Sequence, residues 1–294
     1  MFVVGAARSG TSVLYRTLLQ HPAFAIGTPD FTESFAVTAL TMYRDIGDRL
    51  ANVQGFMGHD DAAWDQFTRT VAPVRRWRRL LWPVVGRWVG RRPVWRALGS
   101  AIVLRTYFDF AARGRRVGRV VEKTPVNLTF TPLIRSAFPN GRMIVIIRHP
   151  VDVLGSYWRR HATDANATWA DISINEFCAT WRAEAEMADD FRRRWPDAFL
   201  VVRYEDFTGD PDREFARICA FVGEPMAADA LRGRHDDYWS AEPLLYEDIK
   251  PSAQGREQFI PAEVAADVSA RLAAPMRLFD YAPQPAPSAD GDRQ

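Results

Sequence analysis

The sequence predicts a three-layer α/β fold, in which a central, mostly parallel sheet lies between helices. Short apolar runs recur along the chain, as at 2–4 and 142–147, and each leads through a loop into a segment with helical spacing of apolar residues. The chain has 294 residues, of which 47% are hydrophobic, enough for one large domain with a sizeable core. We therefore expect a single domain over residues 1–282 and a disordered, proline-rich tail over 283–294.

The first of these units has the features of an anion site. Residues 5–12, Gly-Ala-Ala-Arg-Ser-Gly-Thr-Ser, join the apolar run to a helix, whose first N–H groups have no intrahelical partner and carry partial positive charge. Gly5 and Gly10 nearly match the P-loop spacing G-x-x-x-x-G-K-[ST], which indicates a P-loop-like fold. Thr11 stands in place of the lysine that a nucleoside triphosphate site uses, so we expect a ligand with less charge there.

Two further apolar runs end at charged residues. Arg148 directly follows the run at 142–147, and Ser156 comes eight residues later in a helical pattern. Lys123 comes just after the run at 117–121. Because open parallel sheets bind ligands at the carboxyl ends of their strands, these side chains are expected to meet at one edge. The planar fork of an arginine there suits two oxygens of a phosphate.

Together these segments resemble the sulfotransferase superfamily, whose members use 3′-phosphoadenosine 5′-phosphosulfate (PAPS). Residues 8–12 resemble its 5′-phosphosulfate loop, in the Arg-Ser-Gly-Thr form of tyrosylprotein, carbohydrate and many bacterial sulfotransferases. Arg148 and Ser156 resemble its 3′-phosphate pair. The segments 122–125 (Glu-Lys-Thr-Pro) and 202–206 (Val-Arg-Tyr-Glu-Asp) also resemble family signatures, although the position of the second suggests packing rather than chemistry.

The resemblance implies a transferase that moves the sulfuryl group of PAPS to a hydroxyl or amine of a lipid, glycan or other small metabolite. The product would be 3′-phosphoadenosine 5′-phosphate (PAP), and no metal is expected. The co-substrate site that it implies comprises Arg8, Ser9, Gly10, Thr11, Ser12, Arg148, Ser156 and, by a looser match, Arg256, for which a solvated loop arginine is the alternative.

The implied catalytic residues are Glu33, Arg8 and Lys123. Arg8 and Lys123 would stabilise charge on the leaving phosphate and the transferring group. Glu33 would be the general base, matched by position alone; the alternative is a carboxylate that the dipole stabilises at a helix start. His59 is the second candidate for the base.

An unusual segment covers residues 73–105, within a helical insert predicted at about 45–115. Arg69 to Arg119 contain fourteen arginines and one acid, although the whole chain has a net charge of only +2. The four tryptophans of this segment either pack on the core while the arginines stay solvated, or they form a surface for the acceptor or a membrane. Nucleic acid is not expected as a partner, because no nucleic-acid-binding fold surrounds the segment.

Two other functions stay open: a P-loop nucleotide kinase, which the missing lysine argues against, and a non-catalytic adaptor on the same fold. No signal peptide or transmembrane run is visible, so we expect a cytoplasmic protein, membrane-associated if residues 73–105 meet a lipid surface. Cys178 and Cys219 are expected to be buried free thiols.

Overall fold

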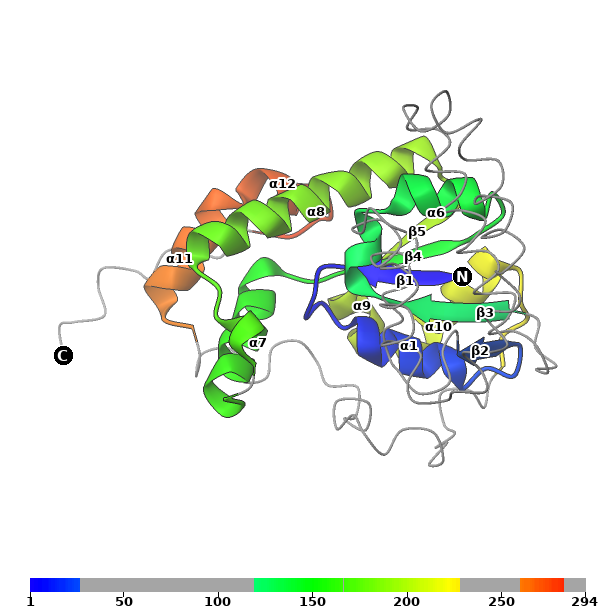
Figure 1. Cartoon of the computed structure of the whole chain (residues 1–294), viewed down its shortest axis with the longest axis horizontal. Helices are drawn as coiled ribbons and strands as arrows, with labels where there is room; N and C mark the ends of the chain where they lie inside the picture. Colours follow the sequence, from blue (N-terminus) through cyan, green and yellow to red (C-terminus); the bar gives the residue numbers. More distant parts are fainter. Residues whose placement is uncertain (27–118, 166, 228–259, 283–294) are drawn as a thin grey trace, which may run out of the picture.

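The computed structural model describes residues 1–26, 119–165, 167–227 and 260–282 (Figure 1). Within them, five strands form one sheet in the order β2-β3-β1-β4-β5, and every neighbouring pair is parallel. The predicted α/β fold with a parallel central sheet is therefore confirmed. The strands are β1 (Phe2–Gly5), β2 (Phe24–Ile26), β3 (Arg119–Lys123), β4 (Met143–Ile147) and β5 (Phe199–Arg203).

Helices cover both faces of the sheet, which gives the three layers (Figure 1). Successive side chains of a strand point to opposite faces, so Val3 belongs to the hydrophobic cluster on one face of the sheet and Val4 to the cluster on the other. The helices on the Val3 face are α1 (Thr11–Leu19), α9 (Tyr204–Gly209) and α10 (Pro211–Val222). The others are η1 (Pro125–Leu128), α6 (Thr131–Ala137), α7 (Pro150–Thr163), η2 (Thr168–Ala170), α8 (Ile174–Arg194), α11 (Ala262–Arg271) and α12 (Ala273–Arg277).

The central strands are apolar throughout because neither of their faces meets water. All five residues of β4 are buried, as are all four of β1. Parallel strands covered by helices on both sides need such continuous apolar runs, which is why these two could be recognised from the sequence. The two cysteines are free and buried, as predicted.

The start of α8 also follows from its sequence. Ser173 caps the helix: its hydroxyl accepts a hydrogen bond from the backbone N–H of Glu176, and the Glu176 carboxylate accepts one from the backbone N–H of Ser173. This capping box satisfies two donors that a helix start leaves free. The helix then runs for 21 residues and crosses from the side of α11 to the side of α6 (Figure 1).

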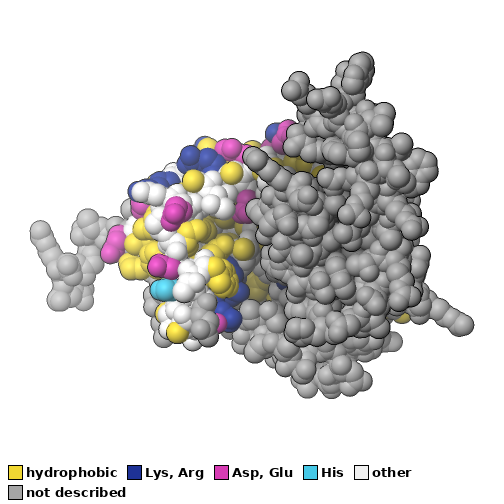
Figure 2. Space-filling view, viewed as in Figure 1, with side chains coloured by type: hydrophobic (Ala, Val, Ile, Leu, Met, Phe, Trp, Pro, Cys, Tyr) yellow, Lys and Arg dark blue, Asp and Glu magenta, His cyan; other side chains and the backbone are white. Residues whose placement is uncertain are grey.

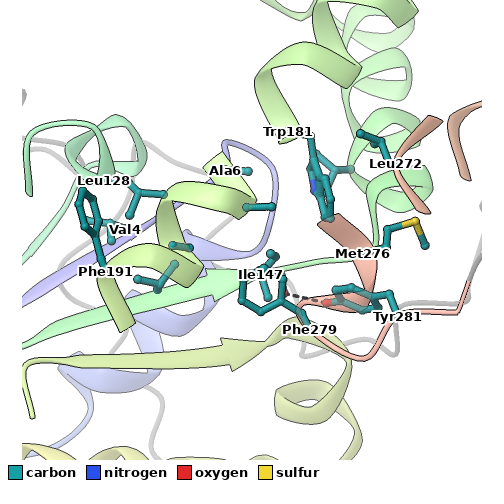
Figure 3. Close-up of a cluster of buried hydrophobic side chains, with 14 of the residues drawn as sticks. Val4, Ala6, Leu128, Ile147, Trp181, Phe191, Leu272, Met276, Phe279 and Tyr281 are labelled. Atoms are coloured by element: carbon teal, nitrogen blue, oxygen red, sulfur yellow. Dashed lines mark hydrogen bonds between the residues drawn. The ribbon is translucent and has the colours of Figure 1, made fainter. Parts of the chain in front are cut away.

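The C-terminal segment returns to the carboxyl end of β4. Figure 3 shows Trp181, Met276, Phe279 and Tyr281 gathered near Ile147. The Tyr281 hydroxyl lies 3.2 Å from the Ile147 carbonyl oxygen. In the space-filling view, hydrophobic side chains remain visible on the described surface around α7, α8 and α11 (Figure 2).

Several sequence predictions lie outside the described residues. They are the insert at about 45–115 with its segment 73–105, and the tail at 283–294. The boundaries of the single domain therefore stay a prediction.

Candidate functional site

The loop between β1 and α1, residues 5–12, has a backbone that only glycine fits at two points. Gly5 has a φ of 143°, and a Cβ there would lie 2.2 Å from the Ile146 carbonyl oxygen. Gly10 has a φ of 98°, and its Cβ would lie 2.3 Å from the Tyr204 ring. Such conformations strain any other residue. The two glycines therefore set the path of the loop, as the P-loop-like spacing predicted.

This loop presents donors that lack acceptors. α1 begins at Thr11 with no side-chain cap on its N–H groups and no acid in its first turn. The Ser9 side chain is fully buried, and its hydroxyl has no hydrogen-bond partner within the described residues. A buried hydroxyl without a partner is costly, and a helix N-terminus favours negative charge. The residues present therefore fit an anionic group such as a phosphate.

Arg8 connects this loop to α7. Its Nε donates a hydrogen bond to the Ser156 hydroxyl at 3.1 Å, across 148 positions of sequence. Arg8 is also one of two residues of the described ranges, other than glycine, with a positive φ, at 69°. Burial, together with the charges of Arg160 and Arg159, lowers the pKa of Arg8. An anion beside this buried guanidinium would therefore stabilise its charge more than an anion beside an exposed arginine would.

Lys123 lies on the other side of the loop, at the end of β3. Its side chain is 2% exposed, and Nζ donates to the Ser12 hydroxyl at 3.3 Å. The turn after it is fixed by Glu122, whose carboxylate accepts hydrogen bonds from the Thr124 hydroxyl and, at 2.8 Å, from the Asn127 amide. Lys123 thus contacts the loop through Ser12, and the hydrogen bonds of Glu122 hold the turn that follows it.

Arg148 leaves the end of β4 and lies over Tyr204. Its guanidinium carbon is 4.3 Å from the ring centroid, and its Nε is 3.8 Å from Asp152 Oδ2. The same ring fills the space beside Gly10, so Tyr204 contacts both the loop and Arg148. Sequence reasoning assigned this tyrosine to packing and missed that it packs between the loop 5–12 and Arg148. Its position directly after β5 is the one signal that could have indicated this.

The structure thus brings Arg8, Ser9, Gly10, Thr11, Ser12, Lys123, Arg148 and Ser156 to one edge of the sheet. Glu33, His59 and Arg256 lie outside the described residues. In the described ranges, no three His, Cys, Asp or Glu side chains converge in the way that a metal ion would require.

Comparison with known proteins agrees with this geometry. The family model described as "Sulfotransferase family" matches residues 1–228. The chain belongs to the sulfotransferase family. Carbohydrate sulfotransferase 3 of Tetronarce californica is 25% identical over 167 residues, which are 51% of this chain and 38% of that relative. The chain therefore spans well under half the length of the curated relative that it matches.

Solved structures of other sulfotransferases show the same fold. The sulfotransferase domain of the Synechococcus PCC 7002 olefin synthase has a TM-score of 0.58 at 22% identity, over 97% of this chain and 94% of that one. Sulfotransferase STF9 of Mycobacterium avium has a TM-score of 0.53 at 16% identity, over 96% of this chain and 77% of that one. Among the described residues of this family member, no helix combines the length and the apolar character needed to cross a bilayer.

Proposed function

We propose that this protein transfers the sulfuryl group of PAPS to a hydroxyl or amine of an acceptor, a lipid, a glycan or another small metabolite. The observation that carries the proposal is the hydrogen bond from Arg8 to Ser156, 3.1 Å long. It brings the loop 5–12 into direct contact with α7, which supports the proposal that the loop and the Arg148–Ser156 pair bind one ligand. A ligand with phosphate groups at both ends of an adenosine fits such a pair of neighbouring segments.

The roles of the residues follow from their positions. The first-turn N–H groups after Gly10 and the hydroxyls of Ser9, Thr11 and Ser12 would hold the 5′-phosphosulfate. Arg148 and Ser156 would hold the 3′-phosphate, with Arg256 as a further ligand. PAPS supplies the activated sulfuryl group and, after transfer, leaves as PAP.

Charge stabilisation would come from Arg8 and Lys123. As the bond between sulfur and the phosphate oxygen breaks, negative charge grows on the leaving phosphate; Arg8 is part of the loop that would hold this phosphate, and Lys123 contacts the loop at Ser12. Fixed charges in a buried site stabilise such charge without rearranging, which is the largest contribution to many enzymatic rates. Positioning of the acceptor supplies most of the remainder.

The transfer also needs a base for the proton of the acceptor. Glu33 is the candidate that the sequence offers, on its position alone. Peripheral membrane contact through residues 73–105 is a further prediction of the sequence. Thr11 in place of the P-loop lysine argues against a nucleotide kinase.

The test is calorimetric titration of the full chain with PAP and with 5′-AMP, which lacks the 3′-phosphate. PAP should bind at least tenfold more tightly than 5′-AMP. Arg148→Ala should weaken PAP binding about 30-fold, because a hydrogen bond to a charged group contributes about 2 kcal/mol to the binding free energy. Arg213→Ala, on the exposed surface of α10, is the matched control and should bind PAP like the wild type.

Turnover is measured with [³⁵S]PAPS, as label transferred to a cell extract and as sulfate released to water. Equal affinity for PAP and 5′-AMP would refute the 3′-phosphate site. PAP binding without any turnover of PAPS would favour the adaptor, and turnover of ATP that needs Mg²⁺ would favour the kinase.

A further inference from the structure

One acidic residue on α8 breaks an otherwise apolar pattern. Every third or fourth residue of this helix faces the core, and these positions form the apolar stripe of α8: Phe177, Trp181, Glu184, Ala188 and Phe191. The four apolar members are at most 8% exposed, and Glu184, in the middle, is half-buried. A carboxyl at such a position costs stability, so its presence needs a reason.

Two other buried acids of the fold have arginine partners that offset the cost of burying a carboxylate. Asp189, one turn further along the helix, is paired with Arg192 at 2.6 Å and with Arg193. Glu214 on α10 is paired with Arg217 at 2.6 Å. Glu184 makes no hydrogen bond and no ion pair with any residue that the structure describes. Burial alone raises its pKa from the usual 4.5 to about 7, which leaves it able to gain or lose a proton near neutral pH.

The surroundings of Glu184 belong to the candidate site. Tyr157, the residue after Ser156, has a pKa raised to about 12, chiefly by burial and further by the charge of Glu184, while the charge of Arg8 lowers it. The Tyr157 ring also packs edge-on against Phe177 of the apolar stripe, with 6.3 Å between the ring centroids. Glu184 therefore lies on the side of α8 that faces Tyr157, and Tyr157 adjoins the contact between Arg8 and Ser156.

Two further contacts fix α8 on this site. One turn before Glu184, the Trp181 indole N–H donates to the Arg148 carbonyl oxygen at 3.3 Å. The helix also packs on η1, which follows Lys123 and contains no titratable residue. Glu184 thus belongs to a helix that contacts the Arg148 carbonyl and packs on the segment after Lys123, and these two residues, with Arg8, are three cations of the proposed reaction.

We propose that Glu184, rather than Glu33, contacts the reacting group of the acceptor and receives its proton. This inference rests on the proposed sulfuryl transfer. The acceptor oxygen forms a bond to sulfur, the bond from sulfur to the phosphate oxygen breaks, and its electron pair leaves on PAP. The acceptor proton goes to the Glu184 carboxylate and from there to solvent. A carboxyl that titrates near neutral pH is suited to this role, because it is basic enough to accept a proton and still largely ionised.

The experiment compares Glu184→Gln and Glu33→Gln with Glu186→Gln, an exposed glutamate two residues along the same helix. Turnover of [³⁵S]PAPS is measured between about pH 5.5 and 9, with the cell extract and with water alone, and PAP affinity is measured by calorimetry. A general base contributes about 10²- to 10⁴-fold. Glu184→Gln should therefore lose at least 100-fold in turnover while its PAP affinity stays within twofold. The rise of the wild-type rate through pH 7 should disappear in this variant and persist in Glu186→Gln.

Each outcome decides one question. If Glu184→Gln turns PAPS over within threefold of the wild type, or keeps the rise through pH 7, the inference fails and the proposed function stands. If Glu33→Gln alone loses turnover, Glu33 is the base. If the wild-type protein neither binds PAP nor turns PAPS over, the proposed function fails, and the inference fails with it.

Discussion

A single methyl group at Gly10 should damage both anion-binding segments at once. Its φ of 98° strains any residue with a Cβ, at a cost of about 1–2 kcal/mol. The added Cβ would also lie 2.3 Å from the Tyr204 ring, which is buried and cannot yield freely. Overpacking of this kind costs about 1–3 kcal/mol. Gly10→Ala should therefore destabilise the fold by about 2–5 kcal/mol.

The same change should reach Arg148 through the tyrosine. The guanidinium lies 4.3 Å from the Tyr204 ring centroid, so a displaced ring moves the side chain proposed for the 3′-phosphate. We expect the melting temperature to fall by about 4–20 °C, at about 2–4 °C per kcal/mol for a chain of this size, and PAP affinity to fall at least tenfold.

The matched control is Gly209→Ala at the end of α9, where no atom lies within 4 Å of the added Cβ. Its backbone is not in the left-handed region, so alanine should change stability by less than about 1 kcal/mol and in the stabilising direction. Equal melting temperatures for the two variants would refute the steric argument. A lower melting temperature for Gly10→Ala with unchanged PAP affinity would refute the connection through Tyr204.

Three other substitutions test separate contacts. Glu184→Gln should stabilise the fold by up to about 3 kcal/mol at pH 8 and leave its stability unchanged near pH 4, as measured by denaturant titration. The reason is that the pKa of Glu184 is raised from 4.5 to about 7, so the wild-type protein loses stability as the pH rises through that window. Equal gains in stability at both pH values would contradict burial of the carboxyl. Tyr281→Phe should cost about 1–3 kcal/mol in the same titration, since it removes the hydroxyl 2.6 Å from Glu205 Oε2 and leaves that carboxylate oxygen without its donor. Ser156→Ala removes the acceptor of the Arg8 hydrogen bond and should weaken PAP binding about 5- to 30-fold, as measured by calorimetry. A change below twofold would count against a single site formed by the loop 5–12 and Ser156.

Much of the site could be predicted because its parts lie next to strand ends in the sequence. Arg148 comes directly after β4, and the loop 5–12 overlaps the end of β1, so an apolar run followed by a charged or glycine-rich segment marks both. Parallel pairing of β1 with β4 then brings the two ends together without further information.

Tyr204 and Glu184 were missed for a different physical reason. Tyr204 acts through its ring, which meets Gly10 and Arg148 only after β1, β4 and β5 have assembled. The local periodicity of hydrophobic residues in the sequence does not predict such a tertiary contact. Glu184 was visible in principle, since a glutamate amid Phe177, Trp181, Ala188 and Phe191 breaks a helical apolar pattern. The pattern shows that the residue faces inward, but only the structure shows that no cation among the described residues forms an ion pair with it.

The pairing of the other buried acids gives this last point its weight. The fold provides arginines to Asp189 and to Glu214 on neighbouring turns of their own helices, so a buried carboxylate in this chain can be neutralised locally when its role is structural. At Glu184, the residues three and four positions further along are Met187 and Ala188, and neither can neutralise it. Arg8, an arginine of the candidate site, donates its Nε hydrogen bond to Ser156. Glu184 is a half-buried carboxyl that pairs with no cation in the described part of the chain, on a helix that contacts a site with several cations. This is the arrangement expected of a group that gains its partner when the acceptor binds.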